Sequence, residues 1–167
     1  KPAIYWYFPN KNALVDEVAR SIYDTYIGYI EKISGSPLSS CEKLRRIVLG
    51  EEDTIQAALM CVFPIKFYLE SYSESHVVKT LIKSGYEKYN ALITAVLEEG
   101  TRNGEFQTCL PVSELAKFIT GAIDGLAFQN LLVSSEKPEV PRSLLFSVLD
   151  RILTPIYPTP RKEVSND

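Results

Sequence analysis

The chain has 167 residues, 46% hydrophobic and 23% charged, enough for one globular domain whose core needs no metal or disulfide to hold it. Its net charge of −3 excludes a protein that coats nucleic acid over its whole surface, although residues 1–12 carry two lysines and no acid. No apolar run approaches the roughly 20 residues of a membrane span, and three scattered cysteines suit neither a disulfide framework nor a zinc site, so we expect a cytoplasmic protein without metal or cofactor.

Apolar residues recur three and four positions apart along almost the whole chain, which predicts an all-α fold. The first helix should follow Asn10 as its N-cap and end at the SGSP stretch of residues 34–37. A second helix is expected over about 40–49, and a third, kinked at Pro64, over about 53–72. Later helices are expected over about 74–102, 111–134 and 141–153, with Gly104 in a left-handed conformation after the first of them.

Two of these helices are apolar around most of their circumference. Within residues 111–134 only Glu114, Lys117 and Asp124 are charged, and the RSLLFSVLDRIL stretch offers a second broad apolar face. We favour a homodimer through an intermolecular four-helix bundle, while a larger monomer with both helices at its centre is the alternative. The expected interface residues are Gly121, Ala122, Gly125, Leu145 and Val148.

Catalytic constellations are absent from the sequence, so we do not expect an enzyme. The single histidine, His76, has no cysteine or carboxylate spaced to form a triad or ligand set with it, and we expect it at the surface. The GEEDT stretch at residues 50–54 places three acids together. A metal would explain them, but acids at a helix N-terminus explain them equally well, and we favour the second interpretation.

The chain opens with KPAIYWYFPNKNALVDEV, eighteen residues with four consecutive aromatics. This stretch resembles the end of the DNA-binding domain of the tetracycline-repressor (TetR) family of transcription regulators, where a short aromatic-rich recognition helix runs into a turn and a lysine touches the DNA backbone. The later EEGTRNGEF and AIDGLAFQNLL stretches resemble weaker C-terminal patterns of the same family. The resemblance implies a helix-turn-helix remnant over 1–12, a helical ligand-binding and dimerisation domain over 13–155, and a flexible tail over 156–167.

The resemblance also assigns DNA contacts. It places base or groove contacts on Lys1, Pro2, Ala3 and Tyr7, and backbone contacts on Tyr5, Trp6 and Lys11. The alternative for the aromatics is packing within a small helical subdomain. The family's domain has two further helices ahead of the recognition helix, about 35 residues that frame the helix-turn-helix, and they are not in this sequence. We therefore expect an N-terminally truncated regulator, in which only the intact protein binds operator DNA.

Members of the family usually bind a small effector between their helices, which turns aromatic density into a predicted pocket. The expected pocket residues are Tyr26, Phe63, Phe67, Tyr89 and Phe118. The sequence thus predicts a ligand-responsive regulator, most simply a repressor that a small apolar or amphipathic effector releases from its operator. The alternative is a helical carrier of apolar ligands, or an interaction module, that never binds DNA.

Overall fold

The computed structural model describes residues 7–49, 67–73, 75–108, 110–133 and 142–153, and within these ranges the regular structure is entirely helical. The helices are α2 (Lys11–Ser34), α3 (Ser40–Leu49), α5 (His76–Arg102), α6 (Val112–Val133) and α7 (Arg142–Ile152). Residues 67–71 form a further short helical turn. The all-α prediction is confirmed, and no helix of the described residues has the length and apolar character to cross a membrane.

The helix ends follow from local chemistry that the sequence already displayed. Asn10 caps α2 by accepting a hydrogen bond from the backbone N–H of Ala13 at 2.9 Å, and Ser75 caps α5 by accepting from that of Val78 at 3.1 Å. Gly104 follows α5 with φ of 73°, the left-handed conformation in which only glycine is unstrained. The expected third helix, with its kink at Pro64, lies mostly outside the described residues.

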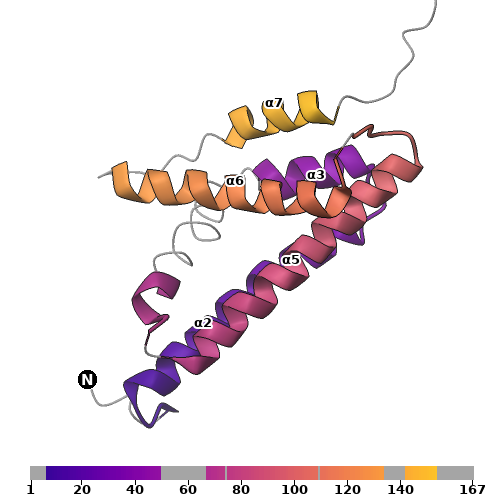
Figure 1. Ribbon diagram of the computed structural model, residues 1–167. Coiled ribbons are helices and arrows are strands. Elements are labelled where there is room, and N and C mark those ends of the chain that lie inside the picture. The colour runs from indigo at the N-terminus through magenta and orange to yellow at the C-terminus, as the bar shows by residue number, and fades with distance from the viewer. Residues whose placement is uncertain (1–6, 50–66, 74, 109, 134–141, 154–167) are drawn as a thin grey trace, which may run out of the picture.

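The longest helices, α2 and α5, lie side by side and run in the same direction (Figure 1). The helices α3, α6 and α7 gather around their C-terminal halves, so the N-terminal halves project as a two-helix arm, with the start of α2 at its free end (Figure 1). The core is formed by the inward residues of these five helices, among them Ile30, Leu44, Ile93, Leu97 and Leu149, each at most 1% exposed. Among the described residues, the core cluster therefore contacts the arm helices in their C-terminal halves.

Polar contacts fix α3 against the C-terminal end of α5. The buried Lys43 ammonium donates to both carboxylate oxygens of Glu99, at 3.0 and 2.8 Å. The carboxylate of Glu105 accepts from the first two backbone N–H groups of α3, those of Ser40 and Cys41, at 3.1 and 3.0 Å. Because these N–H groups have no partner within their own helix, Glu105 caps α3 from a distant part of the chain.

Candidate functional site

A pocket of about 370 Å³ lies between the arm helices, the 67–72 segment and the middle of α6. Its volume falls within the range of about 300 to 1,000 Å³ that is typical of small-molecule sites. The described residues that line it are Ile22, Tyr23, Tyr26, Ile27, Tyr68, Leu69, Tyr72, Leu81, Ile82, Gly85, Tyr86, Tyr89 and Asp124. The periodicity of α2 and α5 explains their share of the lining, because residues three and four apart fall on one face of a helix.

Six of the lining residues are tyrosines, and they come from three separate segments of the chain. The rings of Tyr26 on α2 and Tyr89 on α5 pack at 5.3 Å between centroids and tilt by 52°, which ties the two arm helices together beside the pocket. Burial, reinforced by the nearby Tyr23, raises the pKa of Tyr68 to about 12. That phenol is therefore neutral at physiological pH and able to donate a hydrogen bond.

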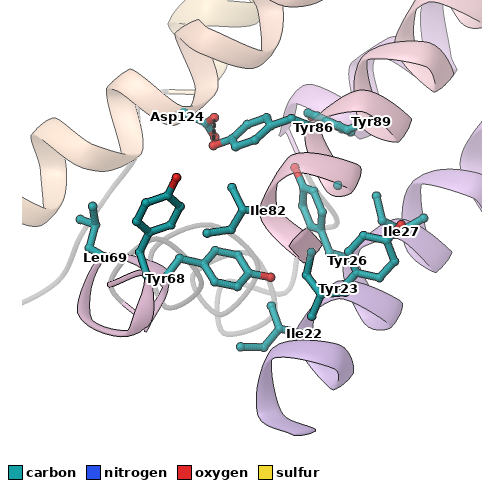
Figure 2. A pocket seen from close by; sticks show the side chains of 13 residues that line it. Ile22, Tyr23, Tyr26, Ile27, Tyr68, Leu69, Ile82, Tyr86, Tyr89 and Asp124 are labelled. Atoms are coloured by element: carbon teal, nitrogen blue, oxygen red, sulfur yellow. Dashed lines mark hydrogen bonds between the residues drawn. The ribbon is translucent and has the colours of Figure 1, made fainter. Parts of the chain in front are cut away.

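The pocket has one carboxyl group among its described lining residues, that of Asp124 on α6. The hydroxyl of Tyr86 donates to its Oδ2 at 2.7 Å, and the two meet at one end of the pocket (Figure 2). Burial raises the pKa of the Asp124 carboxyl, and the hydrogen bond from Tyr86 only partly opposes that rise. The pKa of Tyr86 is raised as well, by burial first and then by its bond to Asp124, so the phenol keeps its proton.

The sequence predicted part of this lining. Tyr26 and Tyr89 lie in the pocket wall, whereas Phe67 packs against Tyr68 at 5.8 Å between ring centroids without being part of the described lining, and Phe63 lies outside the described residues. Phe118 is a correction, because it is 51% exposed and absent from the described lining. The buried face of α6 is made by Leu115, Ile119 and Ile123, and the register of the helix turns Phe118 away from them.

The residues that sequence reasoning missed are Tyr23, Tyr68, Tyr86 and Asp124. One signal could have found the last of them, because Asp124 is the single charged residue between Lys117 and the end of α6. A lone carboxylate in such an apolar stretch needs a specific environment. The tyrosines carried no comparable signal, since aromatic residues at helical spacing are usually core.

A separate apolar surface lies on α6 and α7. Its exposed members are Phe118, Gly121, Gly125, Phe128, Leu132, Leu144 and Val148. A Cβ built at Gly121 or Gly125 would meet nothing within 4 Å, so no packing inside this chain requires glycine there. Of the other expected interface residues, Ala122 is half-buried and packs against the core, and Val148 is 41% exposed.

Leu145 needs a correction. It is 6% exposed and belongs to the core of its own chain, whereas the preceding Leu144 is 62% exposed and joins the apolar surface. A single residue is 100° of helical rotation, enough to exchange an inward for an outward position. The broad apolar stretch in the sequence did not specify which of its leucines pointed inward.

The free end of the arm carries the described part of the predicted DNA-contacting segment. Tyr7 is 83% exposed and Lys11, at the start of α2, is also exposed. The other predicted contacts, Lys1, Pro2, Ala3, Tyr5 and Trp6, lie outside the described residues. Close to this end, the Ser75 hydroxyl donates to Oδ1 of Asp16 at 2.6 Å and thereby joins the start of α5 to α2.

Comparisons with known proteins place this geometry in a family. The sequence profile of the tetracyclin repressor-like C-terminal domain matches residues 48–141. A search of curated protein sequences found no match. Several solved structures share the fold, among them the following three, each at low sequence identity.

The first is E. coli NemR in its reduced form, with a TM-score of 0.73 and 17% identity over 94% of this chain and 82% of that one. The second is FadR of Bacillus subtilis in complex with stearoyl-CoA, with a TM-score of 0.64 and 21% identity over 92% and 81% of the two chains. The third, a Rhodococcus structure described as a TetR-family transcriptional regulator, has a TM-score of 0.62 and 20% identity over 90% and 79%.

Proposed function

Because this chain belongs to the TetR family of transcription regulators, we propose that it is a ligand-responsive repressor whose tyrosine-rich pocket takes a small, mostly apolar effector. FadR, a regulator of similar fold, is known with stearoyl-CoA bound, which supports a ligand-binding role for the helical domain. The effector would release operator DNA by changing the position of the arm.

One observation carries this proposal: the pocket wall and the predicted DNA-contacting end belong to the same uninterrupted helix. α2 begins at Lys11 and reaches the pocket at Ile22, Tyr23 and Tyr26. From Lys11 to Tyr26 the helix spans about 22 Å at 1.5 Å per residue. A tilt imposed on α2 at the pocket therefore moves its free end, because the described core cluster contacts the arm helices in their C-terminal halves.

The hydrogen bond between Ser75 and Asp16 adds a second connection. It links the start of α5 to α2 about one helical turn beyond Lys11, so a shift of α5 at the pocket also acts on the free end of the arm. A hundredfold loss of operator affinity requires the effector to prefer the released arrangement by about 2.7 kcal/mol. Burial of about 100 Å² more apolar surface in that arrangement would supply it.

We propose further that two copies assemble through the apolar surface of α6 and α7. Exposed apolar side chains that gather on one face of a helix often mark an interaction site. The open positions at Gly121 and Gly125 would let a helix of the second copy approach the backbone closely. A dimer would also present two DNA-contacting ends to successive turns of the major groove, about 34 to 36 Å apart.

The pocket is tested with N-phenyl-1-naphthylamine, a neutral dye that fluoresces in apolar surroundings. We expect saturable binding to this chain, and roughly tenfold weaker binding to Ile82→Trp, whose indole would fill the pocket. The matched control is Lys83→Trp, an exposed position one residue along α5, which should bind like the wild type. Equal binding by all three proteins would place the dye elsewhere and refute the pocket.

The regulatory role is tested by linkage. DNA duplexes that bind the protein expressed from its gene are selected from a random pool. The affinity of the protein for the dye is then measured with and without a saturating concentration of the selected DNA. Binding linkage is reciprocal, so the DNA should weaken dye binding by the factor by which the dye weakens DNA binding. A failure to select any DNA would favour the carrier or interaction module over the regulator.

A further inference from the structure

We propose that the effector is an amphipathic cation, a quaternary or protonated amine with an apolar body, whose charged head lies between Asp124 and the tyrosine rings. This inference rests on the proposed function and names the ligand class of the same pocket. Two features of the pocket support it: the charges of its described lining residues and the negative electrostatic potential on the faces of its tyrosine rings.

The described lining contains a carboxyl group and no lysine, arginine or histidine. Asp124 is half-buried, and its hydrogen-bond partner, the hydroxyl of Tyr86, is neutral. A hydroxyl satisfies one lone pair but supplies no opposite charge, and removing a carboxylate from water without a countercharge is costly. Lys88, two residues after Tyr86 on α5, pairs with Glu31. Among the described lining residues no side chain offers a positive charge to the Asp124 carboxylate, and a bound cation would supply it.

The rings suit the same ligand. The face of an aromatic ring carries negative electrostatic potential, and groups of rings are the usual recognition site for quaternary ammonium. Figure 2 shows Tyr68 on one side of the pocket and Tyr23 and Tyr26 on the other, below the end where Asp124 and Tyr86 meet. The apolar groups between them, such as Ile82, provide the surface for an apolar body.

One ring of the lining is already in contact with a cation. The ammonium nitrogen of Lys79 lies 5.3 Å from the centroid of the Tyr72 ring, within the range of a cation–π interaction. An anionic ligand would meet the opposite situation, because its charge would face the Asp124 carboxylate with no basic group of the described lining to offset it. The fatty acyl-CoA bound by FadR is such an anion, so we infer a different class of ligand here.

The test uses two probes of the same shape, (3-hydroxyphenyl)trimethylammonium and 3-tert-butylphenol, which differ in a positive nitrogen against a neutral carbon. Their affinities for this chain are measured by calorimetry at constant ionic strength. We expect the cation to bind roughly 30-fold more tightly than its neutral isostere, since the ion pair and the cation–π contacts both act in a partly desolvated site.

Asp124→Asn removes the charge and keeps the shape and the acceptor for Tyr86. It should weaken the cation roughly 10- to 30-fold and leave the neutral probe within about twofold. The matched control is Asp24→Asn, which removes an exposed carboxylate of α2 outside the lining and should change neither affinity more than about twofold. Unchanged binding of the neutral probe to Asp124→Asn also shows that the variant is folded; if it is not folded, the preference between the two probes in the wild type decides.

Three results separate the two proposals. Preferential binding of the cation, lost in Asp124→Asn, supports the inference. Equal or tighter binding of the neutral probe overturns the inference and leaves the apolar effector pocket standing. Failure of both probes to bind, together with failure of the neutral dye, overturns the pocket and the inference with it.

Discussion

Gly100, near the end of α5, offers the sharpest test of the packing that anchors the arm. A Cβ built there would overlap the ring of Phe106 and come within 2.9 Å of Ser40 Cβ. The carbonyl oxygen of Gly100 also accepts hydrogen bonds from the backbone N–H groups of Glu105 and Phe106, at N···O distances of 2.8 and 3.2 Å. Gly100→Ala should therefore destabilise the protein, even though alanine is the better helix former.

The change in the free energy of unfolding is the sum of one stabilising and two destabilising contributions. Replacing a helical glycine by alanine gains up to about 1 kcal/mol of helix propensity. Overpacking costs about 1–3 kcal/mol, and partial exposure of the displaced Phe106 ring, which is now buried, costs up to about 1.5–3 kcal/mol more. The net loss is about 2–4 kcal/mol, which for a chain of this length lowers the melting temperature by roughly 5–15 °C.

Thermal and urea unfolding followed by circular dichroism measure the effect, with Gly28→Ala as the matched control. Gly28 lies inside α2, is exposed, and has nothing within 4 Å of a built Cβ, so the same substitution should raise stability by up to about 1 kcal/mol. Opposite signs for the two variants support the packing argument. A Gly100→Ala protein as stable as Gly28→Ala would refute it.

Other consequences can be measured independently. Gly121→Leu and Gly125→Leu should each weaken self-association by about 1–3 kcal/mol, measured by sedimentation equilibrium. A standard-size interface should hold at tens of micromolar, so a wild-type chain that is monomeric there would contradict the proposed dimer. Lys11→Ala in the DNA-binding protein should weaken binding to all sequences alike and reduce the salt slope by about one, whereas sequence-dependent losses would argue against a phosphate contact. For Glu105, burial raises the pKa but the backbone hydrogen bonds of α3 outweigh it and hold the pKa below its ordinary value of 4.5. Its stabilising contribution is therefore complete above about pH 5 and is lost as pH falls through the lowered pKa. The difference in unfolding free energy between the wild type and Glu105→Gln should shrink in acid. A difference that does not change with pH would show that the cap is unimportant.

The helices were predictable because their signals are local. The cap at Asn10 and the left-handed turn at Gly104 each depend on a few neighbouring residues, and the boundaries of α2, α3, α6 and α7 agree with the sequence-based expectations to within about one residue. Glu105 as the cap of α3 was not predictable, since it lies 65 positions from Ser40.

Only some of the residues that line the pocket could be predicted from the sequence, and the reason lies in what helical periodicity can tell. Helical periodicity separates inward from outward positions, but it does not tell which inward residues meet a neighbouring helix and which meet a space. Tyr26 and Tyr89 line the pocket where their rings join α2 to α5, and the sequence indicated both only as aromatic residues. Phe118 was misplaced because α6 is apolar on most sides, so periodicity gives little direction there. Leu145 was misplaced because α7 has two adjacent leucines, of which only Leu145 faces the core.

The position of Asp124 on α6 has a consequence for how two copies would respond. The next residue, Gly125, belongs to the exposed apolar surface, so one helix is both a wall of the pocket and part of the proposed interface. In the proposed dimer, an α6 helix of each copy would lie between the two pockets. A ligand that displaces α6 in one copy changes the surface on which the other copy packs. Occupancy of the two sites should then be cooperative, and the sign of that cooperativity would show whether the first ligand prepares or blocks the second pocket.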